Sequence, residues 1–305
     1  MVERPRMAHD ENFSTHFPDT GDVLRRLLPF LDANGVTHAN KRRIAYLRFL
    51  DDWQARRLDH LDARQASELM REIHEIVFVL ETLVTNSLNI PKKLVQAAFD
   101  GDPTQSYEPD QDRGRNYMLN MRAAIYFIRL KYDVILDEHC DVIAEDKKNR
   151  YFIECKRLYS ESKVETRISE AYKQLDARLE RKSGGKKQWG IAWVDPSAII
   201  LQHCRFYMAA TRQGARQAAR YDLIQFSKRF IDRRMLAADR RIMSLVLQMV
   251  WPSCTALDSP VTSGFTSLVT PGHANMGFFE HWRAKRLWYG LFDLESSDDQ
   301  AVAAR

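Results

Sequence analysis

Two short apolar segments separated by an amphipathic helix constrain the fold more than any other feature of this sequence. Tyr151 to Cys155 and Gln188 to Val194 have the length and apolar content of buried strands. Between them, from about Lys163 to Arg181, apolar residues recur every three or four positions, which is the period of a helix with one buried face. Strand, helix and strand in this order predict an α/β fold.

Further predicted elements lie on both sides of this unit. Before it come a helix at about Asn116 to Leu130 and two short strands, Tyr132 to Leu136 and Asp141 to Ala144. The predicted core is therefore αβββαβ with a mixed central sheet. After the core, the sequence predicts a helix at about Asp222 to Ile242, a strand at Ser244 to Val250, a loop rich in Gly, Ser, Thr and Pro at Pro252 to Gly277, and a final aromatic segment.

The chain before the core has a different pattern, because its apolar residues follow helical spacing only. One such stripe joins Ile44, Leu47, Leu50 and Trp53, and a longer one runs from Leu69 to Val84. Composition and periodicity together predict a disordered tail (1–20), an α-helical N-terminal region (21–100), a linker (101–113), the α/β domain (114–294) and a second disordered tail (295–305).

Composition narrows the classes of function. The formal net charge is +5 with a pI of about 9.0, which favours a polyanionic partner. The four cysteines form no CxxC pair, so neither a structural zinc site nor a disulfide framework is expected. No apolar run approaches the roughly 18 residues of a membrane span and the N-terminus is polar, so we expect a cytoplasmic protein without membrane contact.

A triplet of acid, any residue and Lys recurs along the chain, but Glu154-Cys155-Lys156 alone continues an apolar strand. The alternation of a strand puts Phe152, Glu154 and Lys156 on one face, with Ile153 and Cys155 on the other. Charged groups at the end of a buried strand cost free energy unless they are paired or bind a ligand. A cross-strand salt bridge at a sheet edge is the structural alternative to a catalytic site.

Asp141 opens the preceding strand, and the turn from Glu145 to Arg150 would fold this strand against the one that carries Glu154. An antiparallel hairpin can bring Asp141 within side-chain reach of Glu154 and Lys156. Two carboxylates form a hard oxygen site suited to Mg²⁺, and the neighbouring Lys could orient a water molecule and steady charge on a phosphate. This is a minimal set of groups for phosphodiester hydrolysis.

At these residues the chain resembles the PD-(D/E)xK, or restriction endonuclease-like, nucleases: Asp141, twelve intervening residues, then Glu154-Cys155-Lys156, within the αβββαβ order. The resemblance covers about a quarter of the chain, from Gly114 to Val194. It implies that Asp141 and Glu154 ligate Mg²⁺, for which Mn²⁺ may substitute, that the backbone carbonyl of Cys155 is a further ligand, and that Lys156 serves the attacking water.

The resemblance has further implications and two departures. Many relatives place a polar residue on the next helix, here Gln174 or Glu170, although a solvated helix face is the plain alternative. Cys140 stands where the family name has Pro, and the first core helix offers Asn116 and Asn120 where many members have Glu, which puts a second metal in doubt. DNA as substrate, action as a homodimer, and a setting in restriction, defence or repair are expected on resemblance only.

Basic residues near the site give a predicted nucleic-acid surface, with a solvated charged face as its alternative. They are Lys182, Lys186, Lys187, Arg212, Arg216 and Arg220. No bound nucleotide cofactor is expected, because Ser183-Gly184-Gly185-Lys186 lacks the glycine spacing of a phosphate-binding loop. A non-catalytic nucleic-acid-binding or scaffold protein of the same fold is the alternative function, and a protein-interaction role of the N-terminal helices is a third hypothesis.

Overall fold

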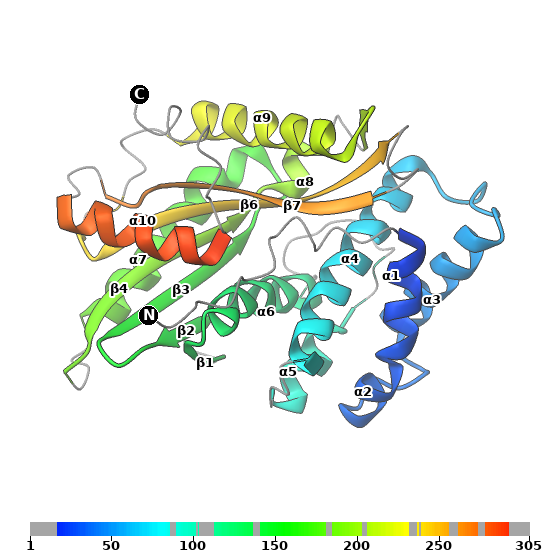
Figure 1. Cartoon of the computed structure of the whole chain (residues 1–305), viewed down its shortest axis with the longest axis horizontal. Coiled ribbons are helices and arrows are strands. Elements are labelled where there is room, and N and C mark those ends of the chain that lie inside the picture. Colours follow the sequence, from blue (N-terminus) through cyan, green and yellow to red (C-terminus); the bar gives the residue numbers. More distant parts are fainter. Residues whose placement is uncertain are drawn as a thin grey trace, which may run out of the picture.

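The computed structural model describes residues 17–85, 90–101, 103, 113–136, 141–180, 185–202, 206–231, 237, 239–255, 262–273 and 278–292. The C-terminal tail, most of the linker, and the site residue Lys182 lie outside these ranges. Figure 1 shows a mixed sheet with helices on both faces and a group of helices from the N-terminal region at one end. Among the described helices, none is both long and apolar enough to span a bilayer.

The helices have the following bounds: α1 Phe17–Arg26, α2 Leu28–Ala33, α3 Lys41–Gln54, α4 Ala63–Thr85, α5 Lys92–Ala98, α6 Arg113–Arg129, η2 Glu161–Lys163, α7 Val164–Leu179, α8 Ser197–Ile200, α9 Arg212–Phe230 and α10 Phe278–Phe292. The strands are β1 Asp133–Ile135, β2 Val142–Glu145, β3 Asn149–Arg157, β4 Lys187–Asp195, β5 Tyr207–Ala209, β6 Ile242–Thr255 and β7 Thr262–Pro271.

The sheet is mixed, as the sequence predicts. Strands β1, β2 and β3 form an antiparallel meander, whereas β4 runs parallel to β3 and β6 runs parallel to β4. The parallel step from β3 to β4 needs a crossover, and α7 supplies it. At the far edge, β6 pairs antiparallel with β7, and its last residues pair parallel with β5. The order α6-β1-β2-β3-α7-β4 follows the predicted elements closely.

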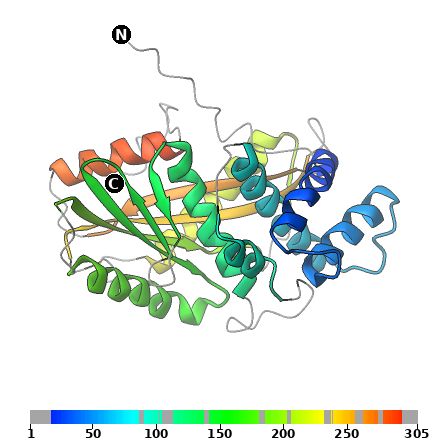
Figure 2. The same ribbon diagram turned by 90° about the horizontal axis from the view of Figure 1, so that it is seen from below.

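The sheet separates two hydrophobic cores. Alternation along β3 sends Ile153 and Cys155 into the core under α4, α6 and α10, while Phe152 packs into the core under α7 and α9. Figure 2 shows α7 and α10 on opposite sides of the sheet. The predicted two-residue period of this strand is thus confirmed.

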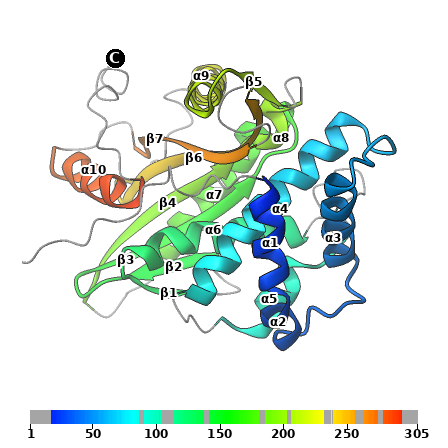
Figure 3. The ribbon, with the colours of Figure 1, turned by 45° about the vertical axis from the view of Figure 1, so that its right-hand side comes forward.

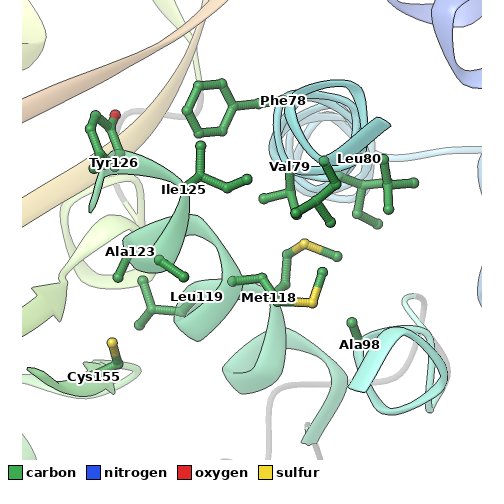
Figure 4. Close-up of a cluster of buried hydrophobic side chains, with 14 of the residues drawn as sticks. Phe78, Val79, Leu80, Ala98, Met118, Leu119, Ala123, Ile125, Tyr126 and Cys155 are labelled. Atoms are coloured by element: carbon green, nitrogen blue, oxygen red, sulfur yellow. The ribbon is translucent and has the colours of Figure 1, made fainter. Parts of the chain in front are cut away.

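The N-terminal helices share their core with the sheet. The close-up in Figure 4 shows Phe78 of α4 beside Ile125 of α6, with Cys155 of β3 on the other side of α6. The apolar stripe predicted on α4 is buried except at its end, where Val84 is 43% exposed. On α3 the buried face is turned away from Ile44, which is 48% exposed, because Tyr46 and Phe49 pack inward instead.

Three boundary predictions were wrong. α1 begins at Phe17, inside the predicted tail, because Thr20, Leu24 and their neighbours pack against the core. The helix expected at Asp222 to Ile242 is α9, which begins ten residues earlier, where the Thr211 side chain accepts the backbone N–H of Gly214 and caps it. Ile242 itself starts β6.

The predicted loop from Pro252 to Gly277 was also wrong in large part, because β6 continues to Thr255 and β7 occupies Thr262–Pro271. Glycine here makes room for a neighbouring ring. Gly264 lies opposite Trp251, and a Cβ at this position would come within 2.6 Å of the indole. The segment has the composition of a loop, but its glycine leaves space for the Trp251 ring and so lets β7 pair with β6.

A buried ionic network joins α4 and α6 to the ends of β3 and β4. Glu75 accepts two hydrogen bonds from Arg157 Nη2, at 2.8 and 3.0 Å, and lies 2.9 Å from Arg122 Nη1. Arg122 also donates to Asp195 at 3.0 Å. The two guanidinium groups hold the pKa of Asp195 to about 2, although burial acts to raise it. A cavity of about 10 Å³ beside these residues has room for about one water molecule.

Removing Glu75 should unfold the chain more easily. In Glu75→Ala, the buried guanidinium groups of Arg122 and Arg157 lose a carboxylate, and we expect the free energy of unfolding to fall by about 3–5 kcal/mol. Urea denaturation followed by circular dichroism measures this change. Glu81→Ala on the same helix, at a half-exposed position, is the matched control and should change stability by less than about 0.5 kcal/mol. Equal effects of the two substitutions would contradict a structural role for the network.

Candidate metal site at the open end of the β2–β3 hairpin

The register of the hairpin brings Asp141 beside Glu154. Val142 pairs with Ile153, so one step further places Asp141, which directly precedes β2, opposite Glu154. Asp141 is fixed by two hydrogen bonds: its Oδ2 accepts the backbone N–H of Cys155 at 2.8 Å, and its Oδ1 accepts the side-chain amide of Asn120 at 2.9 Å. The carboxylate therefore has one position relative to β3 and α6.

Glu154 is buried, with 3% of its surface exposed. Burial, and then the neighbouring carboxylate of Asp141, raise its pKa to about 8, while Lys156 and Arg178 act in the opposite direction. Its Oε2 lies 3.9 Å from Lys156 Nζ. Its Oε1 is buried and accepts no hydrogen bond from any described residue. A buried carboxylate oxygen without a donor is an atom that a cation, a water molecule or a proton can satisfy.

The chemistry of the pair fits a hard divalent cation. A cation between the two carboxylates would offset their repulsion and occupy the unsatisfied oxygen of Glu154. Within the described residues no cluster of three or more His, Cys, Asp or Glu side chains could hold a metal. The remaining ligands would therefore be backbone carbonyls, water or substrate oxygens, a set that Mg²⁺ accepts more readily than zinc does.

Lys156 follows Glu154 on the same face of β3, as predicted from the alternation. Its side chain is 16% exposed, so the ammonium lies partly sheltered beside the carboxylate pair. Cys155 points to the opposite face, where its side chain is buried in the core of α4 and α6. Ligation through the Cys155 carbonyl stays a prediction.

On α7 the structure brings a different residue to the site than the sequence suggested. Gln174 is exposed, and Glu170 is bound to Arg167 Nη1 at 3.1 Å, one turn of helix before Gln174. Arg178, four residues after Gln174, lies close enough to Glu154 to lower its pKa. The sequence offers one signal for Arg178, because its i, i+4 spacing from Gln174 places both residues on one helix face. The catalytic role of Gln174 stays a prediction.

The two described lysines of the predicted basic surface, Lys186 and Lys187, do not lie beside the carboxylates. Lys187 pairs in register with Asn149, five positions before Glu154, which is about 16 Å along the strand. Lys186 is bound to Glu145. These lysines are therefore at the turn end of the hairpin, away from the carboxylates, because β3 and β4 run parallel and begin at the same end.

The three arginines lie along α9, which packs on β5, β6 and β7. Arg216 is exposed, whereas Arg212 and Arg220 are half-buried. Burial of His74 on α4 and then the charge of Arg212 lower the pKa of this histidine to about 3, which places Arg212 close to α4. The three arginines thus lie on one helix, as their spacing predicts, and Arg216 is the exposed one.

Comparisons with models of protein families, with curated proteins and with solved structures found no match for this chain. What the site can do is consequently argued from its own residues.

The raised pKa of Glu154 predicts a pH-dependent stability. The folded chain holds the Glu154 proton more tightly than the unfolded chain, so this stabilisation is complete below about pH 4.5 and is lost as the pH rises through about 8. Glu154→Gln keeps the neutral form at every pH. In EDTA, we expect the variant to exceed the natural chain in unfolding free energy by a few kcal/mol at pH 9, and by little at pH 4. Parallel stability curves from urea titrations would contradict the assignment.

The placement of Arg178 gives a second expectation. Arg178→Met removes a cation near Glu154 and should raise the pKa of the Glu154 carboxyl further, whereas Gln174→Ala should leave this pKa unchanged. The ¹³C chemical shift of the Glu154 side chain, followed against pH in the metal-free protein, measures both variants. A larger shift for Gln174→Ala would restore Gln174 as the neighbour of the site.

Proposed function

We propose that this chain is a metal-dependent nuclease with a restriction endonuclease-like core. The observation that carries the proposal is the meeting of Asp141 and Glu154 at the open end of the hairpin, with one buried oxygen unsatisfied and Lys156 beside it. A simple cross-strand salt bridge is a weaker account, because Lys156 stands 3.9 Å from a carboxylate whose pKa remains raised to about 8.

The element order supports the finer fold assignment. An antiparallel β1-β2-β3 meander, a parallel β3-β4 pair joined by α7, and α6 before the meander correspond to the αβββαβ arrangement that the sequence resemblance implies. The residues proposed to bind the metal, Asp141 and Glu154, lie at the open end of the hairpin formed by β2 and β3. Fold alone does not specify an activity, so the site residues carry the functional part of the proposal.

Each residue has a role in the proposed hydrolysis. Asp141 and Glu154 would hold Mg²⁺ or Mn²⁺, and the bound ion would supply a Lewis acid for the phosphate oxygens. Asn120 and the Cys155 N–H keep the Asp141 carboxylate in place. The Lys156 ammonium would orient the attacking water and stabilise negative charge on phosphorus-bound oxygens as the bond to the leaving oxygen breaks.

The setting of this activity comes from the resemblance. We propose DNA as the substrate, restriction, defence or repair as the process, the cytoplasm as the place, and a homodimer as the form that cuts both strands. The N-terminal helices contribute to the same core as β3, so they form part of the scaffold that positions the site, whatever else they bind.

A cleavage assay tests the function. Purified protein is incubated with plasmid and with single-stranded DNA in Mg²⁺, in Mn²⁺ and in EDTA. We expect cutting only with metal, and a loss of at least about 100-fold in Lys156→Ala, which removes the group beside the water. Lys173→Ala, an exposed lysine of α7, is the matched control and should keep full activity. Binding without cutting under every metal would favour the non-catalytic alternative.

A further inference from the structure

The end of the sheet opposite the carboxylates carries the positive charge of the molecule. We call it the basic end and define it by nine cationic residues: Lys131, Lys147, Lys148, Arg150, Lys186, Lys187, Arg283, Lys285 and Arg286. These residues lie in the segments 131–136, 145–150, 186–189 and 278–286, whose acidic residues are Asp133, Glu145, Asp146 and Glu280. The surplus of five equals the net charge of the whole chain, +5, so the rest of the chain is balanced.

Contacts between the segments of the basic end place them together. The backbone N–H of Lys187 donates to the Lys148 carbonyl at 2.9 Å, which joins β4 to the β2–β3 turn. The guanidinium of Arg283 on α10 lies 4.4 Å from the centre of the Trp189 ring, and Trp189 Nε1 donates to Asn149. Figure 3 shows α10 at the same end of the sheet as the beginning of β4.

Two acids of this end, Glu145 and Asp146, are already engaged. Glu145 is buried and binds both Arg150 and Lys186. Asp146 Oδ1 accepts the backbone N–H groups of Lys148 and Asn149, each at 2.6 Å, within the turn. These carboxylates hold the fold together and are not exposed to compensate the surface charge.

Six cations of the basic end remain exposed. They are Lys131, Lys147, Lys148, Lys187, Lys285 and Arg286, and none forms an ion pair with a described carboxylate. Like charges gathered on one surface repel one another unless screened, and a polyanion relieves this repulsion while releasing its own counterions. The charge alone would suit a nucleic acid, an acidic protein or an anionic membrane.

An exposed aromatic side chain decides among these partners. Trp282 on α10 is 55% exposed, and the Arg286 guanidinium lies 5.6 Å from its ring centre. A flat ring among cations is a stacking platform for an unpaired base, with phosphates on either side held by Lys and Arg. Leu287 and Leu291 lie on the other side of α10 and are buried in the core, so among the described side chains of this helix Trp282 is an isolated exposed apolar group and not part of an apolar face that could enter a membrane.

We propose that the basic end binds a single-stranded nucleic acid segment, with its phosphates on the exposed lysines and one base on Trp282. The inference extends the proposed function, because a strand held here would be anchored about 16 Å from Glu154, the length of about five nucleotides at a rise of 3.4 Å. The basic end is a binding surface separate from the carboxylates and needs no metal.

Fluorescence anisotropy in EDTA tests the binding separately from cleavage. A 20-nucleotide labelled single strand and the matching duplex are titrated against the natural chain and a variant with Lys147, Lys148, Lys187 and Lys285 all changed to Glu. We expect binding of the single strand at least about 100-fold weaker in this variant, and a salt slope smaller by about 3 because four phosphate contacts are lost. Circular dichroism confirms that both proteins are folded.

The control variant changes four exposed lysines elsewhere, Lys41, Lys92, Lys173 and Lys228, to Glu and carries the same net charge. It should lose far less affinity. Equal losses of affinity in both quadruple variants would overturn the proposal, because they would show that binding depends on the net charge of the protein and not on the position of the lysines.

Trp282→Ala tests the proposed stacking. It should weaken binding of the single strand about 5-fold or more and leave binding of the duplex nearly unchanged. No change for the single strand would overturn the role of Trp282. Binding to phosphatidylserine vesicles without binding to either oligonucleotide would overturn the choice of partner. If the single strand binds but no metal-dependent cutting is found, the nuclease proposal at Glu154 fails and the binding proposal stands.

Discussion

The antiparallel register between β2 and β3 is the constraint on which the candidate site depends. Pairing of Val142 with Ile153 leaves Asp141 opposite Glu154 at the open end of the hairpin. A shift of one residue would send Glu154 to the face of α6 and Cys155 to the face of α7, because successive side chains point to opposite sides. The buried Ile153 and Phe152 fix this register, so the hydrophobic core determines which carboxylates meet.

Two buried charged residues of β3, Arg157 and Glu154, differ in whether their charge is paired. Next to Lys156, Arg157 is satisfied by Glu75 and Asp195, and together they connect the strand to α4 and β4. Glu154, two residues before Lys156, keeps one buried oxygen without a hydrogen-bond donor among the described residues, and its pKa is raised. Satisfied ion pairs stabilise one arrangement of the strand end, whereas an unsatisfied carboxylate remains available to a ligand.

Sequence patterns predicted the region around the hairpin better than the C-terminal third. Alternation in β3 and helical spacing in α7 are local signals, and both elements were found close to their predicted bounds. β7 has a loop-like composition and is a strand because β6 offers it a partner, with Gly264 making room for Trp251. Lys186 and Lys187 follow α7 in the chain, but the parallel direction of β3 and β4 carries them to the far end of the sheet.

The sequence by itself determined the α/β class, the strand that carries Glu154 and Lys156 on one face, and the acidic residue before it, because these depend on residues close together in the chain. Tertiary structure alone decided that Asn120 holds Asp141, that Arg178 of α7 lies near Glu154, and that α10 packs beside the start of β4 near the β2–β3 turn. Contacts of this kind depend on how helices pack across a sheet, which no local period of the sequence encodes.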